Sequence, residues 1–196
     1  MTGIGLRVLL VTSVFVGLFC GGIPAQAVAG VAEPDPRLET SRALVAKFAG
    51  ELKSALVAAM AEGGPPSAIQ ACRDLAPAIA SRLSRESGAK LGRTSRRFRN
   101  PNNAPEPWQV AVLESFAAGA AADNDPAEYW SSGPDGRRYM QEIRTAPLCL
   151  ACHGESLAPS VVELLDVEYP HDLARGYRPG ELRGAFSVSW PQTKDE

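Results

Sequence analysis

The sequence is poor in side chains that commonly bind metals, with 2 His, 4 Cys and 3 Met among 196 residues. Beyond its N-terminal segment it has no apolar run approaching the ~20 residues that a membrane-spanning helix needs. It has no strong excess of either charge, because 20 Lys and Arg face 22 Asp and Glu. Repeats and heptads are also missing. These absences argue against a multi-span membrane protein, a coiled coil, a repeat protein and a nucleic-acid-binding protein.

The few Cys and His that are present gather in one motif. Cys149, Cys152 and His153 form Cys-x-x-Cys-His, the attachment signature of a c-type haem. Each Cys would form a thioether with one haem vinyl group, and the His would bind the iron as proximal ligand. The alternatives are a disulfide or half of a zinc site, but a zinc site needs a second Cys or His pair that is missing here. We therefore predict one covalently bound haem c.

The N-terminus has the pattern of a secretory signal peptide. Arg7 precedes an apolar run over residues 8–19, and an Ala-x-Ala cleavage site ends at Ala27. A lipoprotein signal at Cys20 is an alternative, disfavoured by the bulky residue before it. We predict that residues 1–27 are removed and that the mature protein is periplasmic, without a membrane span. Retention of this segment as a membrane anchor is the other outcome.

The mature chain predicts one α+β domain over residues 38–192, after a flexible leader at 28–37. Apolar periodicity predicts a helix over 38–60, a second after Gly63–Pro66 as far as Leu83, a third from Pro105–Pro107 to Phe116 and a short fourth over 161–167. Alternation and turn residues predict a hairpin of 128–130 with 138–143 and a last strand over 182–190.

One Cys of the mature chain is left over. Cys72 lies on the apolar face of the second predicted helix, among packing residues such as Ile69 and Ala76. Pro77 is expected to bend this helix, which would either aim the sulfur or be an ordinary kink. An unpaired Cys in an oxidising compartment requires an explanation.

A basic segment with many turn residues runs from Lys90 to Asn103. The simple interpretation is a solvated loop, because runs of charge usually face water. The sharper interpretation is that Arg93 or Arg99 pairs with the haem propionates, since Arg binds carboxylates bidentately and keeps its charge.

Five blocks in this order resemble a family of exported single-haem c-type proteins with a PAS-like fold. The blocks are 71–77, 92–105, 149–154, 169–177 and 183–188. The resemblance implies a central antiparallel sheet with flanking helices. It also implies that a Cys thiolate opposes the proximal His153, and the position that matches this thiolate is Cys72. Competing ligands are His171, on a turn that reads as exposed, and Met60 and Met140, whose spacing is typical of core packing. A site left open on the distal side is the remaining alternative.

Three classes of function follow. The first is a redox- or gas-responsive sensor, because a thiolate lowers the reduction potential and its weak bond to ferrous iron could release Cys72 and admit CO or NO. The second is a low-potential electron-transfer cytochrome. An enzyme such as a peroxidase comes last, because no distal His/Arg pair can be named. Either of the first two needs a separate redox or signalling protein as partner.

Overall fold

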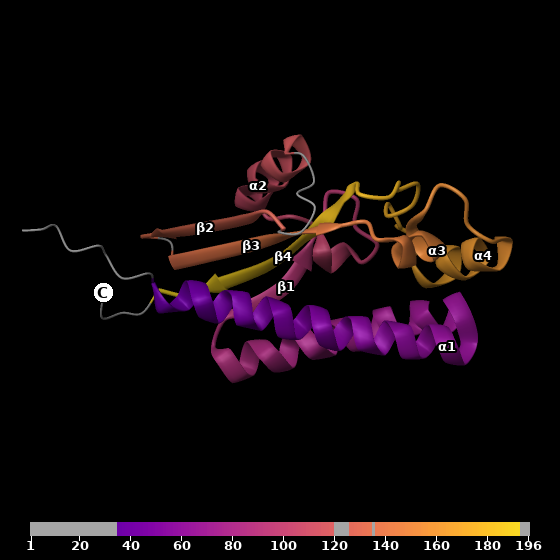
Figure 1. Cartoon of the computed structure of the whole chain (residues 1–196), viewed down its shortest axis with the longest axis horizontal. Coiled ribbons are helices and arrows are strands. Elements are labelled where there is room, and N and C mark those ends of the chain that lie inside the picture. Colours follow the sequence, from indigo (N-terminus) through magenta and orange to yellow (C-terminus); the bar gives the residue numbers. More distant parts are fainter. Residues whose placement is uncertain (1–34, 120–125, 135, 193–196) are drawn as a thin grey trace, which may run out of the picture. The chain divides into compact units, whose positions relative to one another are not determined.

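The computed structural model of this chain describes residues 35–119, 126–134 and 136–192 (Figure 1). The predicted signal peptide and nearly all of the predicted leader lie outside these residues. All described residues belong to one compact unit. In this described part, no helix combines the length and the apolar character that crossing a membrane requires.

In the described residues, the long first helix is followed by a short strand, two helices, a hairpin, three short helices and a final strand. The elements are α1 (Pro36–Ser87), β1 (Lys90–Thr94), η1 (Pro101–Asn103), α2 (Pro107–Ala118), β2 (Glu128–Gly133), β3 (Gly136–Arg144), η2 (Pro147–Cys149), α3 (Leu150–His153), α4 (Pro159–Glu168) and β4 (Leu182–Trp190). The strands form one antiparallel sheet in the order β1-β4-β3-β2. The predicted α+β class, with a central antiparallel sheet and flanking helices, is confirmed.

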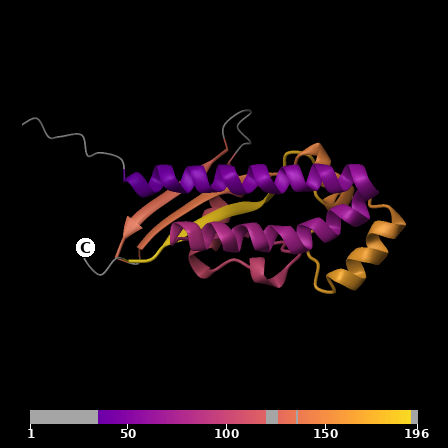
Figure 2. The same ribbon diagram turned by 90° about the horizontal axis from the view of Figure 1, so that it is seen from below.

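Helix α1 is two helical arms joined by a sharp break. Its first turn is capped by Asp35, whose carboxylate accepts a hydrogen bond from the Arg37 amide at 2.9 Å. The break falls at Gly63 and Gly64, and Gly64 has φ 65°, a left-handed conformation that glycine adopts without strain. Two prolines then start the second arm. The arms lie side by side (Figure 2), so the second arm, which carries Cys72, runs back along the first.

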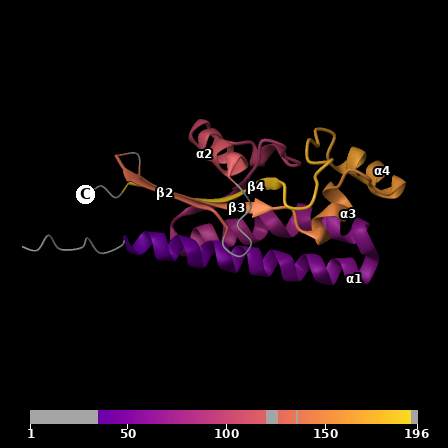
Figure 3. The same ribbon diagram turned by 45° about the horizontal axis from the view of Figure 1, so that its top comes forward.

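The two faces of the sheet are covered by different helices (Figure 3). Both arms of α1 cover one face, where Phe48 packs edge-on against Phe186 with ring centroids 5.4 Å apart. Helix α2 covers the other face, where Leu113 packs with Met140 and Ala185. Helices α3 and α4 lie beyond one end of the sheet, beside the turn of α1 (Figures 1 and 2). The candidate site lies at this end.

Three local predictions differ from the structure. The basic segment after Lys90 begins with an edge strand, β1, because its backbone pairs with β4 and Leu91 is buried in the core. The backbone angles of α1 stay helical at Pro77, so the break in this helix lies at the glycines. Strand β4 does not alternate between core and solvent, because α1 and α2 cover both faces and every residue from Gly184 to Val188 is buried.

Candidate cofactor site

The Cys-x-x-Cys-His motif forms a single helical turn. Cys149 ends η2, and Cys152 and His153 follow within α3. The turn closes at Gly154, where an added Cβ would lie 2.6 Å from the Leu150 carbonyl oxygen, so only glycine fits. Both Cys of the motif are free thiols, as is Cys72, and the disulfide alternative is therefore not what the structure shows.

His153 has one ring nitrogen fixed by a backbone carbonyl, and the other faces the Arg183 guanidinium group at 3.5 Å. Its Nδ1 lies 2.7 Å from the Ala174 carbonyl oxygen. Because a carbonyl only accepts, Nδ1 carries the proton and Nε2 keeps its lone pair. Burial lowers the pKa of His153 well below its ordinary value, and the charges of Arg183 and Arg99 add to this effect. The side chain is therefore a neutral imidazole whose Nε2 keeps the lone pair that binding to a metal requires.

Cys72 belongs to the same neighbourhood. One turn before it, Ile69 packs in a small apolar cluster that includes Cys152. Burial raises the pKa of the Cys72 thiol, whereas Arg93 and other arginine side chains favour its thiolate. The pKa of Cys152 is raised, mainly by burial and in part by electrostatic repulsion from Cys72. The structure thus brings together the motif and the one Cys that the sequence left unexplained.

Two partly buried arginines approach this region without an acidic partner. Burial lowers the pKa of both Arg93 and Arg183. Arg93 lies 5.9 Å from the ring centre of Phe48, and Arg183 Nη2 lies 3.5 Å from His153 Nε2. Among the described residues, no Asp or Glu is within ion-pair distance of either guanidinium group. A buried cation normally has an anionic partner, so the pair fits a ligand that carries carboxylates.

Arg99 is arranged differently from Arg93. Its Nε donates to Asp172 at 3.1 Å, and its Nη2 donates to the carbonyl oxygens of Cys152 at 2.6 Å and Ala174 at 3.3 Å. Its side chain is 11% exposed and that of Asp172 is 1% exposed. These contacts join the motif to the segment around Ala174. A propionate contact of Arg99 stays a prediction, and the contacts seen are internal to the protein.

The competing ligands are placed away from such a role. His171 is exposed on the turn after α4. Met140 is fully buried against α2, on the face of the sheet opposite α1, and packs there as core. Met60 is half-buried near the end of the first arm of α1. Within the described residues, no group of three or more His, Cys, Asp and Glu side chains is arranged to hold a metal ion, which disfavours the zinc alternative.

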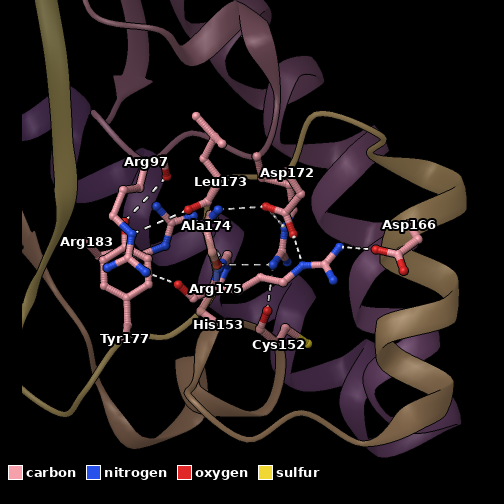
Figure 4. A network of polar contacts seen from close by, with 11 residues as sticks. Arg97, Cys152, His153, Asp166, Asp172, Leu173, Ala174, Arg175, Tyr177 and Arg183 are labelled. Atoms are coloured by element: carbon pink, nitrogen blue, oxygen red, sulfur yellow. Dashed lines mark hydrogen bonds and ion pairs between the residues drawn. The ribbon is translucent and has the colours of Figure 1, made fainter.

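The polar network around His153 includes residues that the sequence did not identify (Figure 4). Asp172 accepts from the Ala174 amide at 2.9 Å and pairs with Arg175 at 2.8 Å. Arg183 and Arg97 both lie near the ring of Tyr177, at 5.2 and 3.9 Å from its centre. Arg183 is the one charged residue of strand β4, and a charge at such a position is the signal that could have drawn attention to it.

The family model for the Tll0287-like family matches residues 31–191 of this chain. The chain belongs to the Tll0287-like family. Among solved structures, a cyanobacterial haem protein, Tll0287, aligns with a TM-score of 0.63 and 24% identity, covering 83% of this chain and 100% of the other. No curated protein matches. At this identity the likeness to Tll0287 concerns the fold, and the predicted family resemblance is confirmed at the level of the Tll0287-like family.

Proposed function

We propose that this protein is an exported haem protein with one covalently attached haem c, and that it acts as a redox- or gas-responsive sensor. The observation that carries the haem assignment is the convergence of the motif, Cys72 and two arginines that lack acidic partners. The family and the haem-binding neighbour support the same assignment. The proposal of export is supported by the signal-like N-terminus. It also agrees with the proposed haem, because c-type haem is attached outside the cytoplasm.

The residues present fit this group in charge and in chemistry. Cys149 and Cys152 would each add a thiol S–H across one vinyl C=C bond, so that an S–C bond forms, the hydrogen goes to the other carbon, and no outside oxidant or reductant is needed. His153 would bind iron through Nε2. Arg93 and Arg183 would bind the two carboxylates. Once bound, the haem supplies one-electron chemistry at its iron.

The sensor role rests on the place of Cys72 in the fold. Cys72 lies on the second arm of α1, two turns after the break at Gly63 and Gly64. A thiolate ligand favours ferric iron, and its bond to ferrous iron is weak. Release of Cys72 on reduction would free the second arm to shift about the glycine break and would open a position for CO or NO.

A second function, low-potential electron transfer, is favoured by contacts that hold Cys72 in place. Ile69 packs against α4 through Val161 and Leu165, and Arg73 forms an ion pair with Glu168. These contacts flank Cys72 on the same arm and oppose its movement. A rigid pair of axial ligands reduces the reorganisation that accompanies an electron transfer. Either function needs a separate redox or signalling protein as partner, and neither requires catalysis.

The first experiment is electron paramagnetic resonance of the purified ferric protein beside Cys72→Ser. A low-spin thiolate signal that disappears in Cys72→Ser supports ligation by Cys72 and His153. The matched control is His171→Ala, which removes the other available imidazole and should leave the signal unchanged. A signal that survives Cys72→Ser, or that changes in His171→Ala, contradicts the assigned ligands.

The second experiment separates the sensor from the electron carrier. Hydrogen exchange of the second arm of α1 is compared between ferric and ferrous protein, together with CO binding to the ferrous form. Faster exchange around Cys72 and binding of CO support the sensor. Equal exchange in both oxidation states without CO binding supports the electron carrier.

A third experiment tests the carboxylate-binding arginines. A positive charge near the iron favours the ferrous state. Arg93→Gln and Arg183→Gln should therefore each lower the reduction potential, and Arg96→Gln, which removes an exposed arginine paired with Glu114, should leave it nearly unchanged. Equal shifts in all three variants would contradict a specific role for Arg93 and Arg183.

A further inference from the structure

The segment Asp172–Tyr177, which we call the strap, holds the far side of His153. The Ala174 carbonyl accepts from His153 Nδ1 at 2.7 Å. The amides of Gly176 and Tyr177 donate to the carbonyls of Gly154 and His153, each at 2.9 Å. The strap thus follows the motif in parallel and contacts it through both backbone and side chain. The position of the Ala174 carbonyl decides how His153 is held.

A buried ion pair fixes that carbonyl. Asp172 accepts from the Ala174 amide at 2.9 Å and from Arg99 Nε at 3.1 Å. Arg99 Nη2 lies 3.3 Å from the Ala174 carbonyl oxygen, the same atom that accepts from His153. Two donors therefore share one acceptor, and one of them is a cation whose charge is balanced by Asp172.

We propose that the Arg99–Asp172 ion pair is a positioning element that sets the strength of the hydrogen bond from His153 Nδ1. Its consequence for iron rests on the proposed haem function, whereas its consequence for the imidazole does not. The residues act through His153, so they are positioning residues and not ligands.

The physical argument predicts opposite effects for the two partners. A stronger bond from Nδ1 makes the imidazole a more basic ligand, which stabilises ferric iron and lowers the reduction potential. In Arg99→Gln the cation no longer competes for the Ala174 carbonyl, so the Nδ1 bond strengthens and the potential falls. In Asp172→Asn the charge of Arg99 is unbalanced, so the Nδ1 bond weakens and the potential rises. A purely structural strap would loosen in both variants and move the potential in one direction.

Arg175→Gln is the matched control. Arg175 pairs with the other carboxylate oxygen of Asp172, at 2.8 Å, and its side-chain hydrogen bonds go to Asp172 and Asp166. Like Arg99→Gln, the substitution Arg175→Gln removes one positive charge from beside Asp172, but it removes no donor from the Ala174 carbonyl oxygen. The reduction potential of the Arg175→Gln protein should shift by less than about half as much as that of the Arg99→Gln protein. An equal shift would overturn the proposal. Because solvent screens Arg175 more than Arg99, a smaller shift must be accompanied by the change in Nδ1 proton exchange described next to support positioning over long-range charge.

The experiment combines reduction potentials with nuclear magnetic resonance of protein labelled with ¹⁵N-histidine. The chain has 2 His, so His153 is assigned against His171 alone. Exchange of the His153 Nδ1 proton should slow in Arg99→Gln and quicken in Asp172→Asn, while Arg175→Gln stays near the wild type. Potentials that move in the same direction in Arg99→Gln and Asp172→Asn, or unchanged proton exchange, would overturn the proposal.

Two further readouts keep the test decisive. If Asp172→Asn does not fold, Arg99→Lys retains the charge and should stay closer in potential to the wild type than Arg99→Gln does, and the reverse order would overturn the proposal. If the purified protein carries no haem, the proposed function fails, but the ¹⁵N shifts of His153 still report which ring nitrogen is protonated. An Nδ1 proton that responds to Arg99→Gln supports the positioning role, and one that does not refutes it.

Discussion

Two regions of this molecule are held together by different forces. We call them the sheet end, made of the strands of the sheet with the helices that cover its faces, and the site end, made of α3, α4, the strap and the adjoining turns of α1. At the sheet end, large side chains such as Phe48, Tyr139 and Leu113 are almost fully buried on the two faces of the sheet. At the site end, the buried apolar cluster consists of Ile69, Val161 and Leu165 with partly buried neighbours. The remaining stabilisation there comes from ion pairs, shared carbonyls and, on our proposal, the haem. A region built in this way depends on each polar contact, because a buried charge that loses its partner is costly.

The largest effect should come from a core substitution at the sheet end. Phe48→Ala removes a side chain that is 1% exposed and packs against Phe186. It should lower the free energy of unfolding by about 3–5 kcal/mol. Chemical denaturation measures this loss, and Val57→Ala, at a site 49% exposed, should cost less than about 0.5 kcal/mol. Equal losses for both would contradict the assigned core.

Breaking the ion pair at the site end should have a smaller and more local effect. Asp172→Asn leaves Arg99 with carbonyl partners only, at a cost of about 3 kcal/mol, the low end of the range for such pairs. Hydrogen exchange should quicken in the strap and in α3, while β3 and β4 keep most of their protection. Uniform loss of protection across both ends would mean that they are one cooperative unit and would remove the contrast drawn here.

The same carboxylate predicts an acid dependence. Burial acts to raise the pKa of Asp172, but hydrogen bonds from Arg99 and Arg175 outweigh it and leave the pKa below its ordinary value. The stabilisation is therefore present above the unfolded pKa of ~3.9 and is lost as pH falls through the folded value. The difference in unfolding free energy between wild type and Asp172→Asn should shrink between about pH 5 and about pH 2. A difference independent of pH would show that Asp172 is not ionised in the folded protein.

The smallest effect sharpens the comparison within the site end. The Arg175 side chain is 29% exposed and is the outer partner of Asp172. Arg175→Gln removes this partner, while Arg99 keeps the carboxylate paired. The expected loss is about 0.5–1 kcal/mol, because solvent screens the outer charge. Among Phe48→Ala, Asp172→Asn and Arg175→Gln, the last should have the melting temperature nearest that of the wild type. A loss as large as that of Asp172→Asn would mean that the outer pair and not the buried one stabilises the strap.

Much of the fold could be predicted because local patterns carried it. Apolar spacing located the helices, and the Gly-Pro run at Gly63–Pro66 located the turn between the arms of α1. Strand β1 was missed, since its pairing with β4 spans a long sequence separation and leaves no local signal. Arg183 was not assigned to the site, because nothing in the alternation of β4 shows that helices cover both faces of the sheet.

The sequence by itself determined the Cys-x-x-Cys-His motif, the leftover Cys72 and the α+β class, because spacing and periodicity are properties of neighbouring residues. Only the tertiary structure decided which side chains surround that motif. The Arg99–Asp172 pair joins residues 73 positions apart, and it is buried only because α4, the strap and the loop after β1 meet at the end of the sheet. Burial and partnership arise from the packing of distant segments, and they set the charge and the hydrogen bonds of His153.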